Sequence, residues 1–283
     1  MTGDKANDAG RSDNDNEPAP QGLAGDGQVR QGLVREGLVR EGLGKESLRP
    51  PLPKRFYTTA AVGEVAGGYG LLLDGRAVKT PRKAPLVLPS RDLAEAIVAE
   101  WAAQGERIDP ATMPLTRLAN TAIDAVAAAR AEVAADIVAF AGTDALCYRA
   151  ETTDPVAEQE APAWDPVLDW AAKTLGARFA VQQGIAHVAQ PPAALAAIAK
   201  AVDAYDVWQL SALHVMTTLT GSAVLALAVA GRHLTVDAAW AIAHVDEDWQ
   251  ISRWGTDEEA QLRRAYRRAE MAAAARFFDA SQG

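Results

Sequence analysis

The chain has 283 residues, of which 49% are hydrophobic, and a formal net charge of -9. This length predicts one or two domains with enough apolar material for a packed core. The negative charge repels phosphate backbones and anionic lipid headgroups, so we expect neither nucleic acid nor a membrane as a partner.

Residues 1–53 differ in composition from the rest of the chain. They are rich in Gly, Asp, Asn and Pro, contain no aromatic residue, and repeat a five-residue unit between Val29 and Leu43. A period of five matches neither a helix nor a strand, and a glycine in every unit costs about 1 kcal/mol in a helix relative to alanine. We predict a disordered, low-complexity tail.

Residues 54–127 have the pattern of a small α+β domain. Asp74-Gly75 lies between apolar runs, which is a strong signal for a two-residue β-hairpin turn, and a further short strand is expected at 86–88. Ser90 then has the character of a helix N-cap, followed by Leu93 and Ile97 at helical spacing. We expect a β-meander sheet followed by a helix.

Residues 128–283 are predicted to form a larger, all-α domain. The segment 151–165 is acidic and contains several prolines, so we expect it to be a surface connection. Apolar spacing predicts helices at 166–175, 192–205, 208–230, 236–253 and 257–278. The most apolar run, 215–230, is shorter than the ~20 residues that cross a bilayer and indicates a buried helix.

Few residues offer catalytic chemistry. Cys147 is the sole cysteine, which excludes an internal disulfide and is typical of a reducing, cytoplasmic compartment. There is no phosphate-binding glycine loop, nucleophile elbow or His-Glu-x-x-His helix. We expect no cofactor. The open alternative is a metal-dependent hydrolase that uses His244 with the carboxylates that follow it.

The segment 237–259 holds seven acids and one base, Arg253, a net charge of -6. Helix ends explain part of this acidity. Thr256 and Glu259 fit a capping box, Gly255 a helix stop, and Glu259 with Arg263 an i, i+4 ion pair. Helix ends do not explain Trp249 and Trp254, which flank Gln250 and Arg253. Large aromatics beside charges are typical of interaction surfaces, although a structural corner is an equal reading.

Four arginines between Arg263 and Arg268 form a basic stretch close after this acidic segment. A scaffold could use such a stretch to dock an acidic partner. The reading we favour is a solvated helix face whose arginines pair with the acids upstream.

Three stretches resemble the F-type ATP synthase assembly chaperone family, the "ATP twelve" family of mitochondria and alphaproteobacteria. The resemblance extends over about residues 54–278 and consists of three ordered groups of residues. The groups are Arg55-Phe56-Tyr57 with Leu73-Asp74-Gly75-Arg76 and Lys79-Thr80-Pro81; Leu88-Pro89-Ser90 through Glu100-Trp101 and Gln104 to Ile108, Met113-Pro114-Leu115-Thr116 and Asn120; and Asp246-Glu247-Asp248-Trp249-Gln250 with Trp254-Gly255 and Glu258.

The resemblance implies a non-enzymatic chaperone that holds the unassembled alpha subunit of the ATP synthase until the beta subunit replaces it. It also implies a small N-terminal α+β domain and a larger helical domain. Acidic positions of the helical domain are tied to function in this family. The partner-binding residues we expect are Asp246, Glu247 and Glu258, together with Trp249, Gln250 and Trp254. We expect the free chaperone to be a monomer in the bacterial cytoplasm.

Overall fold

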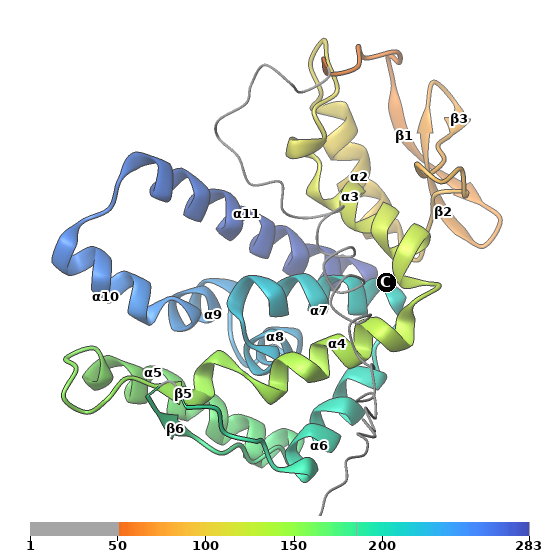
Figure 1. Cartoon of the computed structure of the whole chain (residues 1–283). Coiled ribbons are helices and arrows are strands. Elements are labelled where there is room, and N and C mark those ends of the chain that lie inside the picture. Colours follow the sequence, from red (N-terminus) through yellow and green to blue (C-terminus); the bar gives the residue numbers. More distant parts are fainter. Residues whose placement is uncertain (1–50, 185, 283) are drawn as a thin grey trace, which may run out of the picture. The chain divides into compact units, whose positions relative to one another are not determined.

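A computed structural model describes residues 51–184 and 186–282. The predicted tail, 1–53, therefore lies outside the described residues except for its last three positions. A small antiparallel sheet with two helices comes first in the described part, and a larger group of helices follows it (Figure 1). The predicted α+β fold class is confirmed.

The sheet is a short meander built on one hairpin. Strands β1 (Ala60–Val65) and β2 (Gly68–Leu73) pair antiparallel, and β2 also pairs with β3 (Arg76–Ala77) and β4 (Val87–Leu88). Asp74 and Gly75 both have positive φ, 47° and 78°, between β2 and β3. This backbone conformation is that of a type I′ turn, so the hairpin predicted at Asp74-Gly75 is confirmed.

Two helices cover the sheet region, α2 (Arg91–Ala102) and α3 (Pro114–Thr121). The Leu93 backbone N–H donates to Ser90 Oγ at 3.1 Å, which confirms the predicted N-cap. Glu100 of α2 accepts the backbone N–H groups of Leu115 and Thr116 at 2.7 and 2.8 Å. Its carboxylate therefore caps the N-terminus of α3, which gives the second group of motif residues a structural purpose.

The larger part of the fold is helical, with one addition to the all-α prediction: a two-residue parallel ladder of β5 (Tyr148–Arg149) and β6 (Gln182–Gln183). Short 3-10 turns lie at Pro110–Thr112 and Ala145–Cys147, and π-helical turns at Ala122–Val126 and Ala171–Leu175. The helices are α4 (Arg130–Gly142), α5 (Ala157–Trp170), α6 (Pro192–Asp203), α7 (Val207–Thr220), α8 (Ala223–Ala230), α9 (Val236–Ala243), α10 (Val245–Trp254) and α11 (Glu258–Ser281).

The surface connection expected at 151–165 is wrong in its second half, because α5 begins at Ala157 and contains both Pro162 and Pro166. Trp164 and Val167 of this helix are buried. Proline is incompatible with a helix interior mainly through its missing N–H and its ring. Here both proline rings are exposed, so burial of the opposite face outweighs the local penalty.

Two predicted helices are each divided in the structure. The helix expected at 208–230 ends at Gly221, with φ 66°, and Ser222 caps α8 by accepting the Leu225 N–H at 3.0 Å. The helix expected at 236–253 breaks at His244, which separates α9 from α10. Apolar periodicity continues across both breaks, so it could not reveal them.

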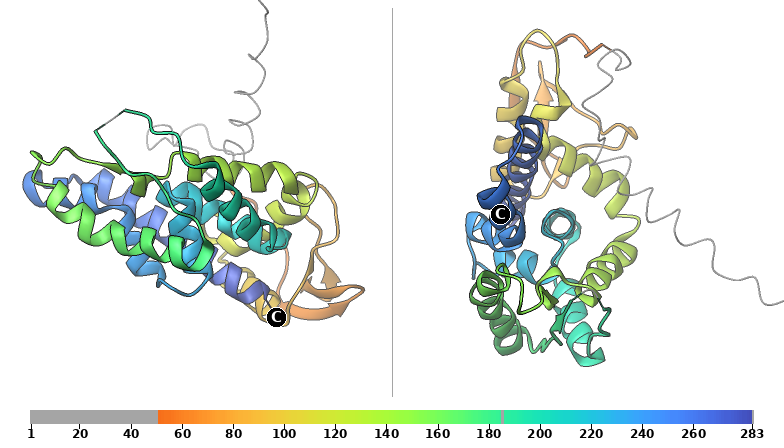
Figure 2. Two further views of the ribbon diagram at one scale, coloured as in Figure 1. Left: turned by 90° about the horizontal axis from the view of Figure 1, so that it is seen from below. Right: turned by 60° about the vertical axis from the view of Figure 1, so that its left-hand side comes forward.

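The core of the helical part forms around α7 and α8. The right-hand view of Figure 2 shows α7 nearly end-on, with α11 and α4 on either side of it. Six of the eight residues of α8 are buried, all but Val229 and Ala230, in agreement with the buried helix expected at 215–230. Cys147 is also buried, and burial raises the pKa of its thiol to about 12. None of the described helices is both long and apolar enough to cross a bilayer.

Helix α11 also contacts the sheet-and-helix part of the fold. Arg117 of α3 forms a 2.5 Å ion pair with Glu270 of α11, whose side chain is 9% exposed. Ser90 Oγ, at the start of α2, donates to the Ala280 carbonyl oxygen near the end of α11. The division into domains at 54–127 and 128–283 stays a prediction.

Candidate interaction surface

The tryptophan-and-acid segment lies in a lightly packed extension of the helical part. We call this extension the arm: α10, the link 255–257, and the first half of α11, residues 258–269. Helix α10 contains no buried residue, and its recorded helix packing is chiefly against α5. Figure 1 shows α10 and the beginning of α11 on the side of the helical part remote from the sheet. An element with so little buried apolar surface is available for other contacts.

The link of the arm is a tight corner set by Gly255 and Asp257. Gly255, with φ 75°, donates its N–H to the Ile251 carbonyl oxygen at 2.8 Å, which confirms it as a helix stop. The predicted capping box of Thr256 and Glu259 is wrong. Asp257 is the N-cap of α11 and accepts the Ala260 N–H at 2.7 Å, because its extended backbone places its own carboxylate there.

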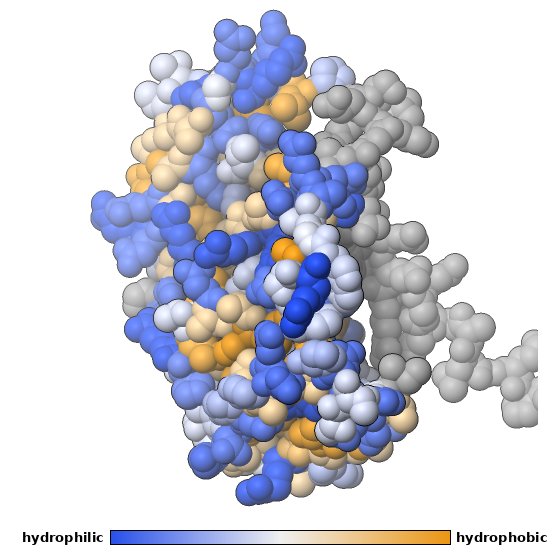
Figure 3. Space-filling model, turned by 90° about the vertical axis from the view of Figure 1, so that its left-hand side faces the viewer, coloured by the Kyte–Doolittle hydropathy of each residue, from blue (hydrophilic) through white to orange (hydrophobic). Residues whose placement is uncertain are grey.

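Three large apolar side chains are exposed on the arm: Trp254 is 74% exposed, Leu262 58% and Tyr266 45%. Within the described residues only three other large apolar side chains are exposed, so half of these side chains come from 13 residues of sequence. The rings of Trp249 and Trp254 meet edge to face at 5.4 Å. Apolar areas on this side of the molecule are separated by hydrophilic ones rather than joined in one sheet (Figure 3).

Leu262 and Tyr266 were not among the residues predicted from sequence. Positions 262, 266, 270 and 274 lie on one face of α11, and both Glu270 and Ala274 are buried. The apolar face of α11 therefore continues past the point where the core covers it. The signal was present in the sequence as an i, i+4 apolar pair interrupted by arginines, but periodicity alone cannot tell where coverage ends.

The four arginines of the basic stretch in α11 are occupied by the acids and backbone around them. Arg263 pairs with Glu259 at 2.7 Å, Arg264 with Asp248, and Arg268 with Asp237 at 2.7 Å. Arg267 donates to the Leu219 carbonyl oxygen at 3.0 Å. The favoured reading, a solvated basic face paired with upstream acids, is confirmed. These pairs tie α9 and α10 to α11.

Asp246 contacts α5 and is nevertheless an exposed residue. Its carboxyl shares a hydrogen bond with that of Glu160, a residue of α5 that is only 2% exposed. Glu160 also accepts the Ala150 N–H at 2.8 Å. Dehydration at this contact raises the pKa of both carboxyls, so one of them holds a proton more readily than an exposed acid would. Asp246 thus fastens α10 to α5.

The remaining predicted residues are open to solvent to differing degrees. Gln250 and Glu258 are exposed, and within the described ranges neither has a recorded hydrogen bond or ion pair. Glu247 is partly exposed, with Oε2 4.0 Å from His244 Nε2. The structure therefore places all six predicted residues on the arm surface, and Asp246 is in addition tied to α5 through Glu160.

His244 is explained by packing. Its ring lies 3.9 Å from that of Trp240, and its Nδ1–H donates to the Trp240 carbonyl oxygen at 2.8 Å. Burial lowers the pKa of this histidine and favours the neutral form. In the part of the chain that the structure describes, no group of three or more His, Cys, Asp or Glu side chains is arranged to hold a metal ion.

Comparison with known proteins places this fold in a family. The model of the family described as ATP12 chaperone protein matches residues 54–172. The chain is 26% identical over 227 residues to the mitochondrial protein atp12 of Schizosaccharomyces pombe, which corresponds to 74% of this chain and 78% of that protein.

Solved structures extend the similarity to almost the whole described part. Atp12 from Paracoccus denitrificans is 41% identical, with a TM-score of 0.77, over 81% of this chain and 98% of that one. A mutant of the same protein gives equal values. Atu1473 from Agrobacterium tumefaciens, a candidate chaperone, is 45% identical with a TM-score of 0.79, over 88% of this chain and 94% of that one.

The sheet-and-helix unit joined to a helical part is thus the architecture of the solved Atp12 structures. The chain belongs to the ATP12 family of ATP synthase assembly chaperones. The predicted family resemblance is confirmed.

Proposed function

We propose that this chaperone binds the unassembled alpha subunit of the ATP synthase through the arm and keeps it from aggregating until the beta subunit takes its place. Family membership supports assembly of the ATP synthase as the setting. The observation that carries the choice of surface is the exposed set Trp254, Leu262 and Tyr266, beside the unpaired Glu258.

The chemistry of the arm suits capture followed by release. A chaperone must bury apolar surface of its client without binding so tightly that exchange stops. Separate apolar side chains set among charges provide contact area of limited extent, and rim charges contribute to orientation and on-rate more than to affinity. Such an arm needs no reactive group or cofactor.

Within this proposal the predicted residues divide by role. Trp249 and Trp254 supply apolar contact, while Glu247, Gln250 and Glu258 face basic or polar groups of the client. Asp246 holds α10 to α5 through Glu160, and its exposed surface is also available to the client. We also propose that the free chaperone is a monomer and acts in the bacterial cytoplasm. A single cysteine, which cannot form an internal disulfide, is typical of that reducing compartment.

Co-purification with separately expressed subunits tests the function. We expect stable capture of alpha and none of beta, together with less light scattering from alpha on dilution out of denaturant. Capture of neither subunit, under conditions in which alpha aggregates, would contradict the proposed function.

Charge reversal tests the surface. Replacing Glu247 and Glu258 together by lysine should weaken alpha capture, because the Glu247 side chain is 44% exposed and Glu258 is also exposed. The matched control is Glu95→Lys, an exposed carboxylate on α2, far from the arm in sequence. Unchanged capture and unchanged folding stability in the double variant would remove the arm from the proposal.

A further inference from the structure

A second acidic segment lies on α5 and has no part in the arm. Residues 150–172 contain six acids and no lysine or arginine, a net charge of -6. Two of these acids have a cationic partner just outside the segment: Asp165 pairs with Arg149 at 2.7 Å and Asp169 with Lys173 at 3.3 Å. The exposed acids on α5 itself are Glu158, Asp165 and Asp169, since Glu151 and Asp154 precede the helix and Glu160 is buried.

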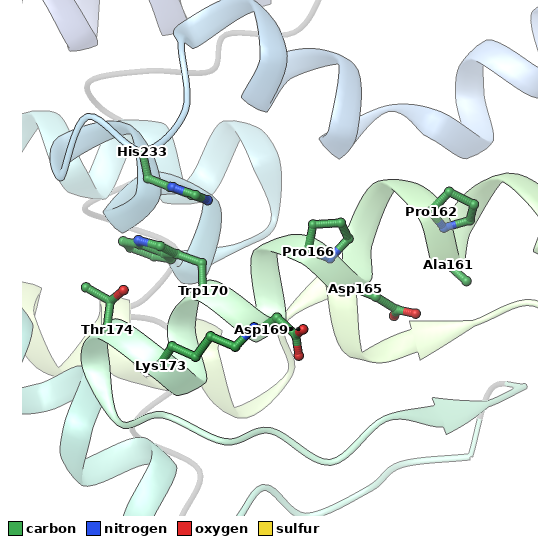
Figure 4. A pocket seen from close by; sticks show the side chains of 9 residues that line it. All are labelled: Ala161, Pro162, Asp165, Pro166, Asp169, Trp170, Lys173, Thr174 and His233. Carbon is green, nitrogen blue, oxygen red and sulfur yellow. Dashed lines mark hydrogen bonds and ion pairs between the residues drawn. The ribbon is translucent and has the colours of Figure 1, made fainter.

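The exposed side of α5 is hollowed by a groove of about 630 Å³. Pro162, Pro166 and Trp170 follow one another at i, i+4 spacing along it, and all three rings stand on the same side of the helix (Figure 4). His233, from the turn after α8, stacks on Trp170 with ring centroids 5.0 Å apart and planes 7° apart. We call this feature the proline–tryptophan groove.

The two prolines do not serve the stability of α5. A proline inside a helix removes one backbone hydrogen bond and costs about 3 kcal/mol relative to alanine. Because Pro162 and Pro166 lack N–H groups, the carbonyl oxygens of Glu158 and Pro162 have no helical donor. Both rings are exposed, so the prolines themselves add nothing to the core, and burial of the opposite face of α5 carries their cost. The groove thus offers rigid apolar rings beside carbonyl groups that lack their i, i+4 donor.

We propose that the proline–tryptophan groove is a second docking site, for a client segment that carries arginine or lysine next to an apolar side chain. The inference rests on the proposed chaperone function. Charge complementarity selects this occupant: the carboxylates of Asp165 and Asp169 line the groove and stay 63% and 70% exposed although Arg149 and Lys173 pair with them. An arginine there gains carboxylate and carbonyl acceptors and an aromatic ring to stack on.

Direct binding of short peptides to the full chain tests the groove. The probes are a fluorescein-labelled hexapeptide Gly-Arg-Leu-Arg-Leu-Gly and its counterpart with glutamate in place of both arginines, followed by anisotropy. We expect saturable binding of the arginine peptide, about fivefold weaker for Asp169→Lys and for Pro166→Ala. Glu95→Lys is the matched control, because Glu95 is also an exposed carboxylate in an i, i+4 pair.

Pro166→Ala separates docking from folding, since restoring the N–H should leave the chain as stable as before or more stable. Equal binding of the glutamate peptide, equal binding by all variants, or a concentration-dependent dimer that Pro166→Ala abolishes would each overturn the inference.

Alpha capture by the same variants separates this inference from the proposed function. Strong capture by wild type that neither groove variant weakens would remove the groove as a client site while leaving the function in place. Absence of capture by wild type, with the peptide result intact, would contradict the proposed function and keep the groove as a site for basic segments.

Discussion

The two halves of α11 have the same backbone and opposite surroundings. We call the described structure apart from the arm the body. In the second half of α11, the buried residues that pack against the rest of the body are Glu270, Met271, Phe277 and Phe278. In the first half, Leu262 and Tyr266 continue the same face into solvent, and four arginines beside them hold the acids and backbone of neighbouring segments. One helix thus anchors the fold at one end and presents apolar side chains at the other.

The difference shows how an exposed apolar surface can be held in place without a core beneath it. Ion pairs to α9 and α10 and the Asp246–Glu160 contact position the arm, while its large side chains stay free. Exposed ion pairs contribute little free energy individually, so the arm is expected to be less stable than the body.

The largest expected effect on stability comes from removing the buried Phe277 ring. Phe277→Ala should lower the free energy of unfolding by about 3–5 kcal/mol, because this fully buried ring would leave a cavity. Tyr266→Ala, in the first half of the same helix, should change the free energy of unfolding by less than about 1 kcal/mol. Urea unfolding followed by circular dichroism measures both. Equal losses would mean that the two halves of α11 do not differ.

Ion pairs should follow the same division. Arg117→Ala leaves Glu270 buried without its partner and should cost about 3 kcal/mol or more. Arg268→Ala breaks a pair whose side chains are 57% and 76% exposed and should cost no more than about 1 kcal/mol. The two variants can be compared in one denaturant series. A larger cost at Arg268 would show that the arm is part of the cooperative core.

The body, but not the arm, should respond to pH through Asp144. Burial raises the pKa of this carboxyl from 3.8 to about 6, although it accepts the N–H groups of Leu146 and Val224. The folded state therefore binds more protons between these pH values, so the contribution of Asp144 to stability rises as pH falls through 6 and is lost as pH rises.

Unfolding free energies of wild type and Asp144→Asn, measured from pH 7 to pH 4, isolate this contribution. Their difference should shift in favour of wild type by up to about 3 kcal/mol as the pH falls. A difference that stays constant across this range would contradict the assignment.

Much of the fold follows from local chemistry. The Asp74-Gly75 turn, the Ser90 cap and the Gly255 stop each depend on a residue type with a strong backbone preference, and the structure has all three. The helix around Pro162 and Pro166 could not be predicted locally, because burial of Trp164 and Val167 on its other face decides it.

The interaction surface was predictable only in part. Trp254 and Glu258 stand out in sequence and are exposed in the structure. Asp246 looked equivalent to its neighbours, yet a partner 86 positions earlier in the chain, Glu160, ties it to α5. Leu262 and Tyr266 were missed because their spacing is that of a buried stripe. In each case the deciding contact is distant in sequence.

The most direct test of the arm is the affinity for the alpha subunit of two variants that remove equally exposed aromatic rings. Trp254 is 74% exposed on the arm and Phe56 is 73% exposed beside the sheet. Trp254→Ala should weaken alpha binding about tenfold or more, as loss of an aromatic anchor does, with folding stability nearly unchanged. Phe56→Ala should leave the affinity for the alpha subunit within about twofold of wild type, since only the arm is assigned to the client. Equal affinity in the two variants, or a greater loss for Phe56→Ala, would contradict the account.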